Sequence, residues 1–348
     1  MQISKEKIFN QLGSFPGTRY MGSKEKLLPA LYETFQELEF DSALDLMSGT
    51  GVVSYLLKSM QKEVISNDYM HMNHVIAQTL IKNNSSKMTT TQARELIKPN
   101  LKSRFVTEKF DGLYYDKDDS EMIDNIRNNI NELSNSAQRN IALTALIRSC
   151  IKKRPRGIFA YTGLRYNDGR KDLKLSLNEH FLLNIELINK AIFTNKRKNQ
   201  AINKDCLEVN HKADLVYIDP PYFSPLSDNE YVRRYHFVEG IARNWKDVEW
   251  QTSTKTKKFK SYPSPFSKLE STIEAFEFLI KKHSESHIVI SYSSNALPKK
   301  DVILKILKKY KKRAYVNSVD YRYSFSNQNF AKDKIKNQVS EYIFVGTD

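Results

Sequence analysis

Four short apolar segments, each ended by turn-forming residues, limit the folds open to this chain more than any other feature of its sequence. A continuous apolar run of this length is typical of a strand buried on both faces of a parallel sheet. Apolar residues with helical spacing fill the intervals before and after the first segment, at 27–38 and 52–60. This alternation predicts an α/β fold with a Rossmann-like, doubly wound core. The four segments are 43–47, 63–67, 215–218 and 287–292.

Residues 85–199 interrupt the alternation with polar, amphipathic helical patterns, and 348 residues are long for one ordinary domain. We therefore expect a core split into 1–84 and 200–348, with 85–199 inserted as a second, mainly helical domain. Near the carboxyl terminus the pattern predicts a helix at 302–310. Two late strands are expected at 314–319 and 341–345.

The charge of the chain points to an anionic partner. Lys and Arg total 55 against 40 Asp and Glu, which gives a formal charge of +15. No stretch approaches the ~18 apolar residues of a membrane span, and the polar amino terminus lacks a signal-peptide pattern. Two cysteines, Cys150 and Cys206, cannot build a disulfide framework. We expect a cytoplasmic protein with no membrane partner, and nucleic acid is the leading candidate ligand.

Nearly half of the surplus charge lies in residues 148–174, which hold nine Lys or Arg and two Asp. Aromatic and turn-forming residues are interspersed among them, a composition that suits contact with phosphates and bases. A solvated surface loop has the same composition, so the segment alone leaves both interpretations open. The candidate DNA contacts are Arg154, Arg156, Arg165, Arg170 and Lys171.

A glycine turn follows the first predicted strand and opens a helix. Gly49 and Gly51 allow the backbone to approach a ligand closely. Asp68 ends the next predicted strand, where an acidic side chain accepts hydrogen bonds from ribose hydroxyls in nucleotide-binding folds. Ser54 stands where the dinucleotide fingerprint has its third glycine, which favours a cofactor without pyrophosphate. An ordinary tight turn is the alternative.

A rigid loop follows the third predicted strand, where Asp219, Pro220, Pro221 and Tyr222 stand in sequence. Proline removes backbone donors and fixes φ, so the loop presents carbonyl oxygens beside one carboxylate. Two such acceptors suit an exocyclic amino group, while the tyrosine stacks on the ring that bears it. A structural connection rich in proline would not require Asp and Tyr at these places.

In these motifs and their order the chain resembles the S-adenosylmethionine-dependent, adenine-specific DNA methyltransferases of the Dam-like (alpha) group. The likeness spans residues 17–295 in outline, although Met47 and Thr50 depart from residues common in that group. The segments that carry it are Arg19 to Lys24, Asp45 to Gly51, Asn67-Asp68, Asn203 to Asp205, Asp219 to Tyr222, Arg234 to Glu239 and Ser291 to Asn295.

The resemblance implies methyl transfer from S-adenosylmethionine to the N6 amino group of a flipped adenine. Asp219 and the Pro220 carbonyl would hold the amino group, and Tyr222 would stack on the base. No covalent intermediate and no metal ion would be needed. The implied cofactor-binding residues are Tyr20 and Lys24 at the methionine end, Asp45, Gly49 and Gly51 at the turn, Asp68 at the ribose, Asp205 at the adenine, and Asp219.

The implied partner is double-stranded DNA, and the family implies a bacterial restriction–modification system with a restriction endonuclease encoded separately. Two alternatives share the chemistry: an RNA adenine methyltransferase and a DNA cytosine-N4 methyltransferase. A third is a non-catalytic DNA-binding relative. Asp at position 219, where a serine would suit cytosine, favours adenine. A metal site at His71 and His74 is less favoured than a helix surface, because no third ligand is near them in the sequence.

Overall fold

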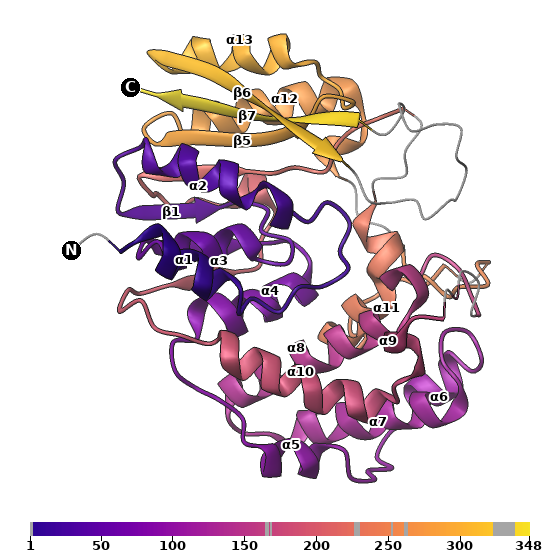
Figure 1. Cartoon of the computed structure of the whole chain (residues 1–348). Helices are drawn as coiled ribbons and strands as arrows, with labels where there is room; N and C mark the ends of the chain where they lie inside the picture. Colours follow the sequence, from indigo (N-terminus) through magenta and orange to yellow (C-terminus); the bar gives the residue numbers. More distant parts are fainter. Residues whose placement is uncertain are drawn as a thin grey trace. The chain divides into compact units, whose positions relative to one another are not determined.

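The fold is that of an α/β protein with a mixed sheet. The computed structural model describes residues 3–163, 167, 169–225, 230–251, 253–260, 264–322 and 338–348, with backbone only for 321, 322, 338 and 339. Within these residues seven strands occur in the sheet order β3-β2-β1-β4-β5-β7-β6. Figure 1 labels four of them, β1, β5, β6 and β7. They are β1 Ser42–Asp45, β2 Glu63–Asn67, β3 Gln200–Ile202, β4 Leu215–Ile218, β5 His287–Ser293, β6 Arg313–Arg322 and β7 Gln338–Thr347.

The sequence-based prediction of an α/β fold is confirmed. The four apolar segments form β1, β2, β4 and β5, and the two late strands are β6 and β7, both longer than expected. The short strand β3 was missed because three residues, Gln-Ala-Ile, are too few to display a strand pattern. The predicted helix at 302–310 begins two residues earlier, as α13 Lys300–Tyr310.

Contacts divide the chain into two compact units. The first unit comprises Met1–Glu25, Ser48–Asn203 and Glu230–Tyr262. It contains the parallel pair β2–β3 and most of the helices. These helices are α1 Lys5–Leu12, α3 Val52–Ser59, α4 His71–Ala77, α5 Thr90–Leu96, α6 Phe105–Lys109, α7 Lys117–Glu132, α8 Ser136–Lys153, α9 Lys171–Lys174, α10 Leu177–Ala191 and α11 Tyr231–Arg243.

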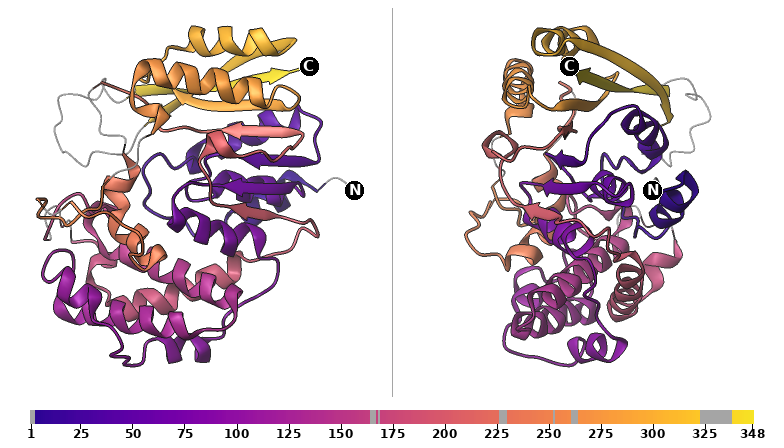
Figure 2. Two further views of the ribbon diagram at one scale, coloured as in Figure 1. Left: turned by 180° about the vertical axis from the view of Figure 1, so that it is seen from behind. Right: turned by 90° about the vertical axis from the view of Figure 1, so that its left-hand side faces the viewer.

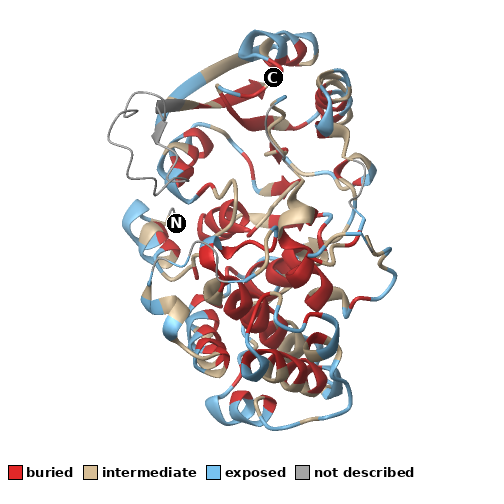
Figure 3. Cartoon of the chain, turned by 90° about the vertical axis from the view of Figure 1, so that its right-hand side faces the viewer, coloured by how far each residue is buried: buried red, intermediate tan, exposed pale blue. Residues whose placement is uncertain are grey.

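The helices of the first unit begin where their sequence provides caps. Thr89 with Gln92, and Ser176 with Glu179, form capping boxes at the starts of α5 and α10. The apolar helix α8 packs against α4, α7, α10 and α11 and is the buried centre of this part. Figure 3 shows buried residues concentrated in such inner helices and in the strands, with exposed residues on the outer turns.

The second unit comprises Lys26–Met47, Lys204–Asn229 and Pro263–Asp348. Its strands β1, β4 and β5 are parallel, whereas β7 runs antiparallel to both β5 and β6. Its helices are α2 Leu28–Gln36, α12 Leu269–Lys282 and α13, and α12 and α13 pack against each other (Figure 2). Since β1, β4 and β5 are parallel, their carboxyl ends share one edge, where catalytic loops of doubly wound proteins lie.

The boundaries of the two compact units differ from the predicted domain boundaries at 84/85 and 199/200. Residues 85–199 are mainly helical, as expected, but their helices cluster with residues 48–84 and with α11. The DNA-recognition role of residues 85–199 is part of the proposed function below.

Candidate active site

In the first unit, the aromatic ring of Tyr20 is stacked on a second tyrosine. Its ring lies 4.7 Å from that of Tyr235 at an interplanar angle of 16°. The Tyr235 hydroxyl also accepts a hydrogen bond of 2.8 Å from the backbone N–H of Met21, which fixes the segment. Asn73 donates to the Tyr20 hydroxyl at 3.0 Å. Burial and the nearby Asp68 carboxylate raise the pKa of Tyr20 well above its ordinary value, so the hydroxyl stays protonated.

The glycine turn lies against this tyrosine. Gly49 and Gly51 have φ angles of +53° and +79°, which other L-residues rarely adopt. A Cβ atom on Gly49 would lie 3.3 Å from Cε1 of Tyr20, closer than most real contacts of this kind. Gly51 precedes the first residue of α3. The turn therefore requires glycine for its conformation at both positions and for space at Gly49.

Asp68 holds the turn from the end of β2. Its carboxylate accepts hydrogen bonds of 2.8 Å from the N–H groups of Gly49 and Met70. The side chain is 8% exposed, and this burial raises the pKa of Asp68 to about 6 despite those donors. Asn203 holds the backbone at the same place by donating to the carbonyls of Asp68 and Tyr69, at 2.8 and 3.0 Å. Asp68 is thus a buried carboxylate that remains ionised near neutral pH.

Lys24 belongs to the same unit and is 6% exposed. Its ammonium group donates a hydrogen bond of 2.8 Å to the carbonyl of Gly22.

Helix α4, which follows Asp68, is capped by Glu239 from α11. The Glu239 carboxylate accepts hydrogen bonds from the N–H groups of His71 and Met72, both at 2.9 Å. His71 also contacts Glu239 through Nδ1 at 3.2 Å, so its role is to pair with this cap.

In the second unit, Asp219 follows β4 and is held by a chain of hydroxyl groups. Ser291, two residues before the end of β5, donates a hydrogen bond of 2.9 Å to Oδ1 of Asp219. The Tyr217 hydroxyl lies 2.6 Å from Oγ of Ser291. Because the single Ser291 proton points to the carboxylate, Tyr217 is the donor in this second bond. Burial and the Asp219 carboxylate raise the pKa of Tyr217, which keeps its hydroxyl protonated.

The rest of the loop is rigid and has one aromatic group at its end. Pro220 is buried and Pro221 half-buried, and neither has a backbone N–H. The Tyr222 hydroxyl donates to Oε2 of Glu341 on β7 at 2.8 Å, and lies 3.4 Å from Oδ1 of Asp219. The loop therefore brings a carboxylate, a carbonyl and an aromatic ring together on a short, stiff segment.

Asp45 and Asp205 also belong to the second unit. Asp45 ends β1, is fully buried, and lies opposite Tyr217 in the register with β4. Asp205 caps the short 3-10 helix Cys206–Glu208 by accepting a hydrogen bond of 2.8 Å from the N–H of Leu207. Burial raises the pKa of the Cys206 thiol, so this cysteine is a packed thiol and no nucleophile.

Arg154 requires a correction, because it is buried and was predicted to contact DNA. The side chain is 0% exposed, and its guanidinium group donates to the carbonyls of Tyr114, Tyr161 and Gly163 at 2.8–3.1 Å. It stacks over the Tyr161 ring at 4.8 Å. Planar guanidinium groups satisfy several buried carbonyls at once, so Arg154 holds the loop after α8 in place rather than meeting a phosphate.

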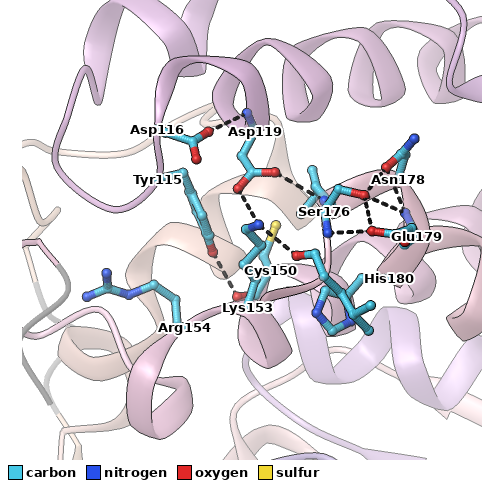
Figure 4. Close-up of polar contacts among 12 residues, drawn as sticks. Tyr115, Asp116, Asp119, Cys150, Lys153, Arg154, Ser176, Asn178, Glu179 and His180 are labelled. Carbon is cyan, nitrogen blue, oxygen red and sulfur yellow. Dashed lines mark hydrogen bonds and ion pairs between the residues drawn. The ribbon is translucent and has the colours of Figure 1, made fainter. Parts of the chain in front are cut away.

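The other predicted DNA contacts differ in exposure. Arg156 and Lys171 are exposed and Arg170 is half-buried, whereas Arg165 lies outside the described residues. Charge in this segment is also used internally: Lys153 pairs with the buried Asp119 at 2.8 Å (Figure 4). Part of the basic surplus at 148–174 therefore stabilises the helices instead of lying on the surface.

Sequence reasoning gave no role to Ser291 and Tyr235, although both lie in segments that carry the family resemblance. It missed Asn73 and Glu341 entirely. The signal for Ser291 was its place near the end of a buried strand parallel to β4, which brings it to the edge where Asp219 lies. Glu341 gave no signal, because a single acid in an apolar strand is not a motif.

No group of three or more His, Cys, Asp or Glu is placed to hold a metal ion among the residues that the structure describes. In that same part of the chain, no helix is long and apolar enough to cross a membrane.

Comparison with known proteins identifies the family. The model of the D12 class N6 adenine-specific DNA methyltransferases matches residues 20–295. Type II methyltransferase M2.HphI of Haemophilus parahaemolyticus is 26% identical over 330 residues, covering 90% of this chain and 94% of that one. Type II methyltransferase M.CviAII of Paramecium bursaria Chlorella virus 1 is 24% identical over 338 residues, covering 93% and 97%. Modification methylase StsI of Streptococcus sanguinis is 29% identical over 350 residues, covering 94% of this chain but 51% of its own.

The matched region begins at Tyr20, extends beyond Asp219 and Ser291, and makes up well over half of the chain. The protein belongs to the D12 class of N6 adenine-specific DNA methyltransferases.

Proposed function

We propose that Asp219 and the carbonyl of Pro220 bind the N6 amino group of an adenine turned out of the DNA helix. The hydrogen bond of 2.9 Å from Ser291 to Oδ1 of Asp219 supports this most directly. A carboxylate accepts hydrogen bonds through both of its oxygens, and a donor on Oδ1 fixes the plane in which the group meets the substrate.

The amino group of adenine is a poor nucleophile because its lone pair is delocalised into the ring. When two acceptors hold its two hydrogens, the nitrogen can become pyramidal and its lone pair can point at an electrophile. The Asp219 carboxylate also stabilises the positive charge that develops on the nitrogen. Asp219 need not be a strong base, since the methylated nitrogen sheds its proton readily. Catalysis of this kind is mainly positioning and electrostatic stabilisation.

Membership in the family implies S-adenosylmethionine as the methyl donor, whose sulfonium supplies an activated methyl group. The residues of the first unit fit the ribose and methionine parts of such a molecule. Within the described part of the chain, the buried Oγ of Ser48 and Oδ1 of Asn73 have no hydrogen-bond partner. Ser48 precedes Gly49, whose N–H binds Asp68, and the Asn73 side chain also interacts with the Asp68 carboxylate. Buried polar atoms without partners are costly, so a polar ligand at this place would satisfy them.

We propose that Asp68 binds the ribose hydroxyls, that Gly49 and Gly51 allow close approach, and that Tyr20 packs on the methionine end toward which Lys24 reaches. In the second unit we propose Asp205 for the adenine amino group and Asp45 beside the turn. The transfer needs no metal ion in this proposal, because hydrogen-bond acceptors and an activated donor supply what the reaction requires. Chelation by EDTA should therefore leave the rate unchanged.

The turned-out base costs a few kcal/mol to unstack. We propose that stacking on Tyr222 offsets part of this cost. Exposed cations of the helical part, Arg156 and Lys171 with Arg170, would contact the phosphates of double-stranded DNA, and residues 85–199 would recognise the target site.

We also propose that the protein is the modification enzyme of a type II restriction–modification system in a bacterial cytoplasm, with a separately encoded endonuclease. The similarity to type II methyltransferases supports this role. Restriction of unmodified DNA in cells that carry the neighbouring genes, and its absence after methylation, would test it.

The catalytic assignment is tested by Asp219→Asn in a methyl-transfer assay with radiolabelled donor and DNA. We expect the rate to fall at least about 100-fold, because the neutral amide lacks the negative charge that stabilises the positive charge developing on the adenine nitrogen. Asp301→Asn at the exposed start of α13 is the control and should keep its rate. A fully active Asp219→Asn variant would overturn the assignment.

A further inference from the structure

A buried carboxylate on the strand after the family-matched region contacts the catalytic loop. Glu341 lies on β7, beyond residue 295 where the family match ends, and is 1% exposed. A carboxylate in such surroundings is costly unless hydrogen bonds satisfy it. The adjacent residues of β7 on the carboxyl side, through Val345, are mostly apolar, so the acid at this place is not explained by the strand itself.

The direction of β7 brings this acid to the loop. Because β7 is antiparallel to β5, its first residues lie beside the carboxyl end of β5, and Glu341 is directly opposite Ser293. Ser291 is two residues before Ser293 and so lies on the same face of the sheet. Adjacent strands thus supply one group each: Ser291 contacts Asp219, and Glu341 contacts Tyr222.

Distances decide where the Tyr222 proton goes. The hydroxyl is 2.8 Å from Oε2 of Glu341 and 3.4 Å from Oδ1 of Asp219. Hydroxyl hydrogen bonds are normally 2.5–3.0 Å long, and a phenol has one proton. The bond therefore goes to Glu341. The Tyr222 ring also meets Tyr292 edge to face, with centroids 5.0 Å apart, which supports the ring from a second side.

We propose that Glu341 is a positioning residue that fixes the ring of Tyr222 for stacking on the turned-out adenine. This rests on the proposed role of Tyr222 in the catalytic loop. The buried hydrogen bond of 2.8 Å to Glu341 holds the Tyr222 ring in one rotamer before the base arrives. Without this hydrogen bond, the Tyr222 ring becomes ordered only when the base binds, and the entropy lost in that step weakens the binding of the base.

The test is a double-mutant cycle with Glu341→Ala, Tyr222→Phe and the combined variant. Each single variant should slow single-turnover methyl transfer about tenfold. The combined variant should be slowed by about the same factor and not by about 100-fold, because both changes remove one bond. Glu341→Gln, whose carbonyl still accepts from the phenol, should restore most of the rate. The fluorescence of 2-aminopurine at the target position should report altered stacking in Glu341→Ala and Tyr222→Phe.

A matched control pair exists on the surface of the second unit. Tyr310 donates a hydrogen bond of 2.9 Å to Glu277, far in the sequence from the loop. Glu277→Ala and Tyr310→Phe should change neither the rate nor the fluorescence. Thermal unfolding of every variant, measured without DNA, identifies any variant that does not fold. If Glu341→Ala does not fold, the rate and fluorescence of Glu341→Gln are compared with those of Tyr222→Phe instead.

Additive effects in the cycle, or a Glu341→Ala variant with wild-type rate and fluorescence, would overturn the positioning role. Failure of the catalytic assignment gives a different result, namely full activity in Asp219→Asn. If Asp219→Asn is inactive while the cycle is additive, the catalytic loop stands and only the role of Glu341 is refuted.

Discussion

Replacing Ser291 with alanine separates the positioning of Asp219 from the stability of the fold. The serine is 0% exposed and makes one hydrogen bond to the Asp219 carboxylate and one to the Tyr217 hydroxyl. A hydrogen bond to a charged group contributes about 1.5–3 kcal/mol, and a buried hydroxyl left without a partner costs about 1–3 kcal/mol. The bond from Ser291 to the Asp219 carboxylate is of the first kind. The Tyr217 hydroxyl, left without its Ser291 partner, bears the second cost.

We expect Ser291→Ala to slow single-turnover methyl transfer by about 10- to 100-fold if the lost bond is needed to orient the carboxylate. Urea unfolding should show a loss of about 1–3 kcal/mol. Adding Tyr217→Phe removes the stranded hydroxyl, so stability should partly recover while the rate stays low. Tyr217→Phe alone should keep most of the rate, because Ser291 still donates to Asp219.

A second buried serine provides the control. Ser286 is 7% exposed and donates a hydrogen bond of 2.6 Å to the carbonyl of Ala213. Ser286→Ala should lose stability without losing rate. If Ser291→Ala transferred methyl groups at the wild-type rate, or if its rate recovered together with its stability in the double variant, the reasoning about Asp219 would be refuted.

Three further predictions concern the cofactor turn and the basic segment. Gly49→Ala forces a side chain into a positive φ and against Tyr20, so it should cost about 1–2 kcal/mol and weaken S-adenosylmethionine binding in calorimetry; unchanged affinity would contradict the close approach. The pKa of Asp68 is raised to about 6, so cofactor affinity should rise as the pH increases from about 5 to about 7, and Asp68→Asn should flatten that profile. The carboxyl group of Asp68 has a lower pKa in the unfolded chain than in the folded protein, so it loses its proton at lower pH when unfolded. The free energy of unfolding should therefore fall as the pH rises from about 4 to about 6, and Asp68→Asn should remove this fall. Arg154→Ala should destabilise the protein by about 3 kcal/mol or more through stranded carbonyls. Arg156→Ala, at an exposed position, should cost far less stability and reduce the salt dependence of DNA binding; the reverse pattern would restore Arg154 as a DNA contact.

The sheet was largely predictable because its parallel strands are buried on both faces and therefore appear as continuous apolar runs. The glycine turn and the Asp-Pro-Pro-Tyr loop were predictable for a related reason: tight backbone geometry restricts which residues can stand there. Gly49, for example, has both a positive φ and a close neighbour in Tyr20.

Long-range partners were less accessible to sequence reasoning. Arg154 lies in a basic, aromatic segment of the kind that contacts DNA, and only the fold reveals that three carbonyls accept hydrogen bonds from its guanidinium group. Glu341 lies 122 residues after Asp219 in the sequence, and only the reversed direction of β7 brings it to Tyr222. Charge counts and motifs do not contain this information, since both depend on which strands become neighbours.

The most direct test of the central claim is to express the protein and its Asp219→Ala variant in a host that lacks DNA methylation, and to sequence the DNA for modified bases. The account predicts N6-methyladenine at one recurring sequence with the wild-type protein and none with the variant, although the variant still binds DNA. Methylated adenine at the same sites in cells with folded Asp219→Ala would contradict it.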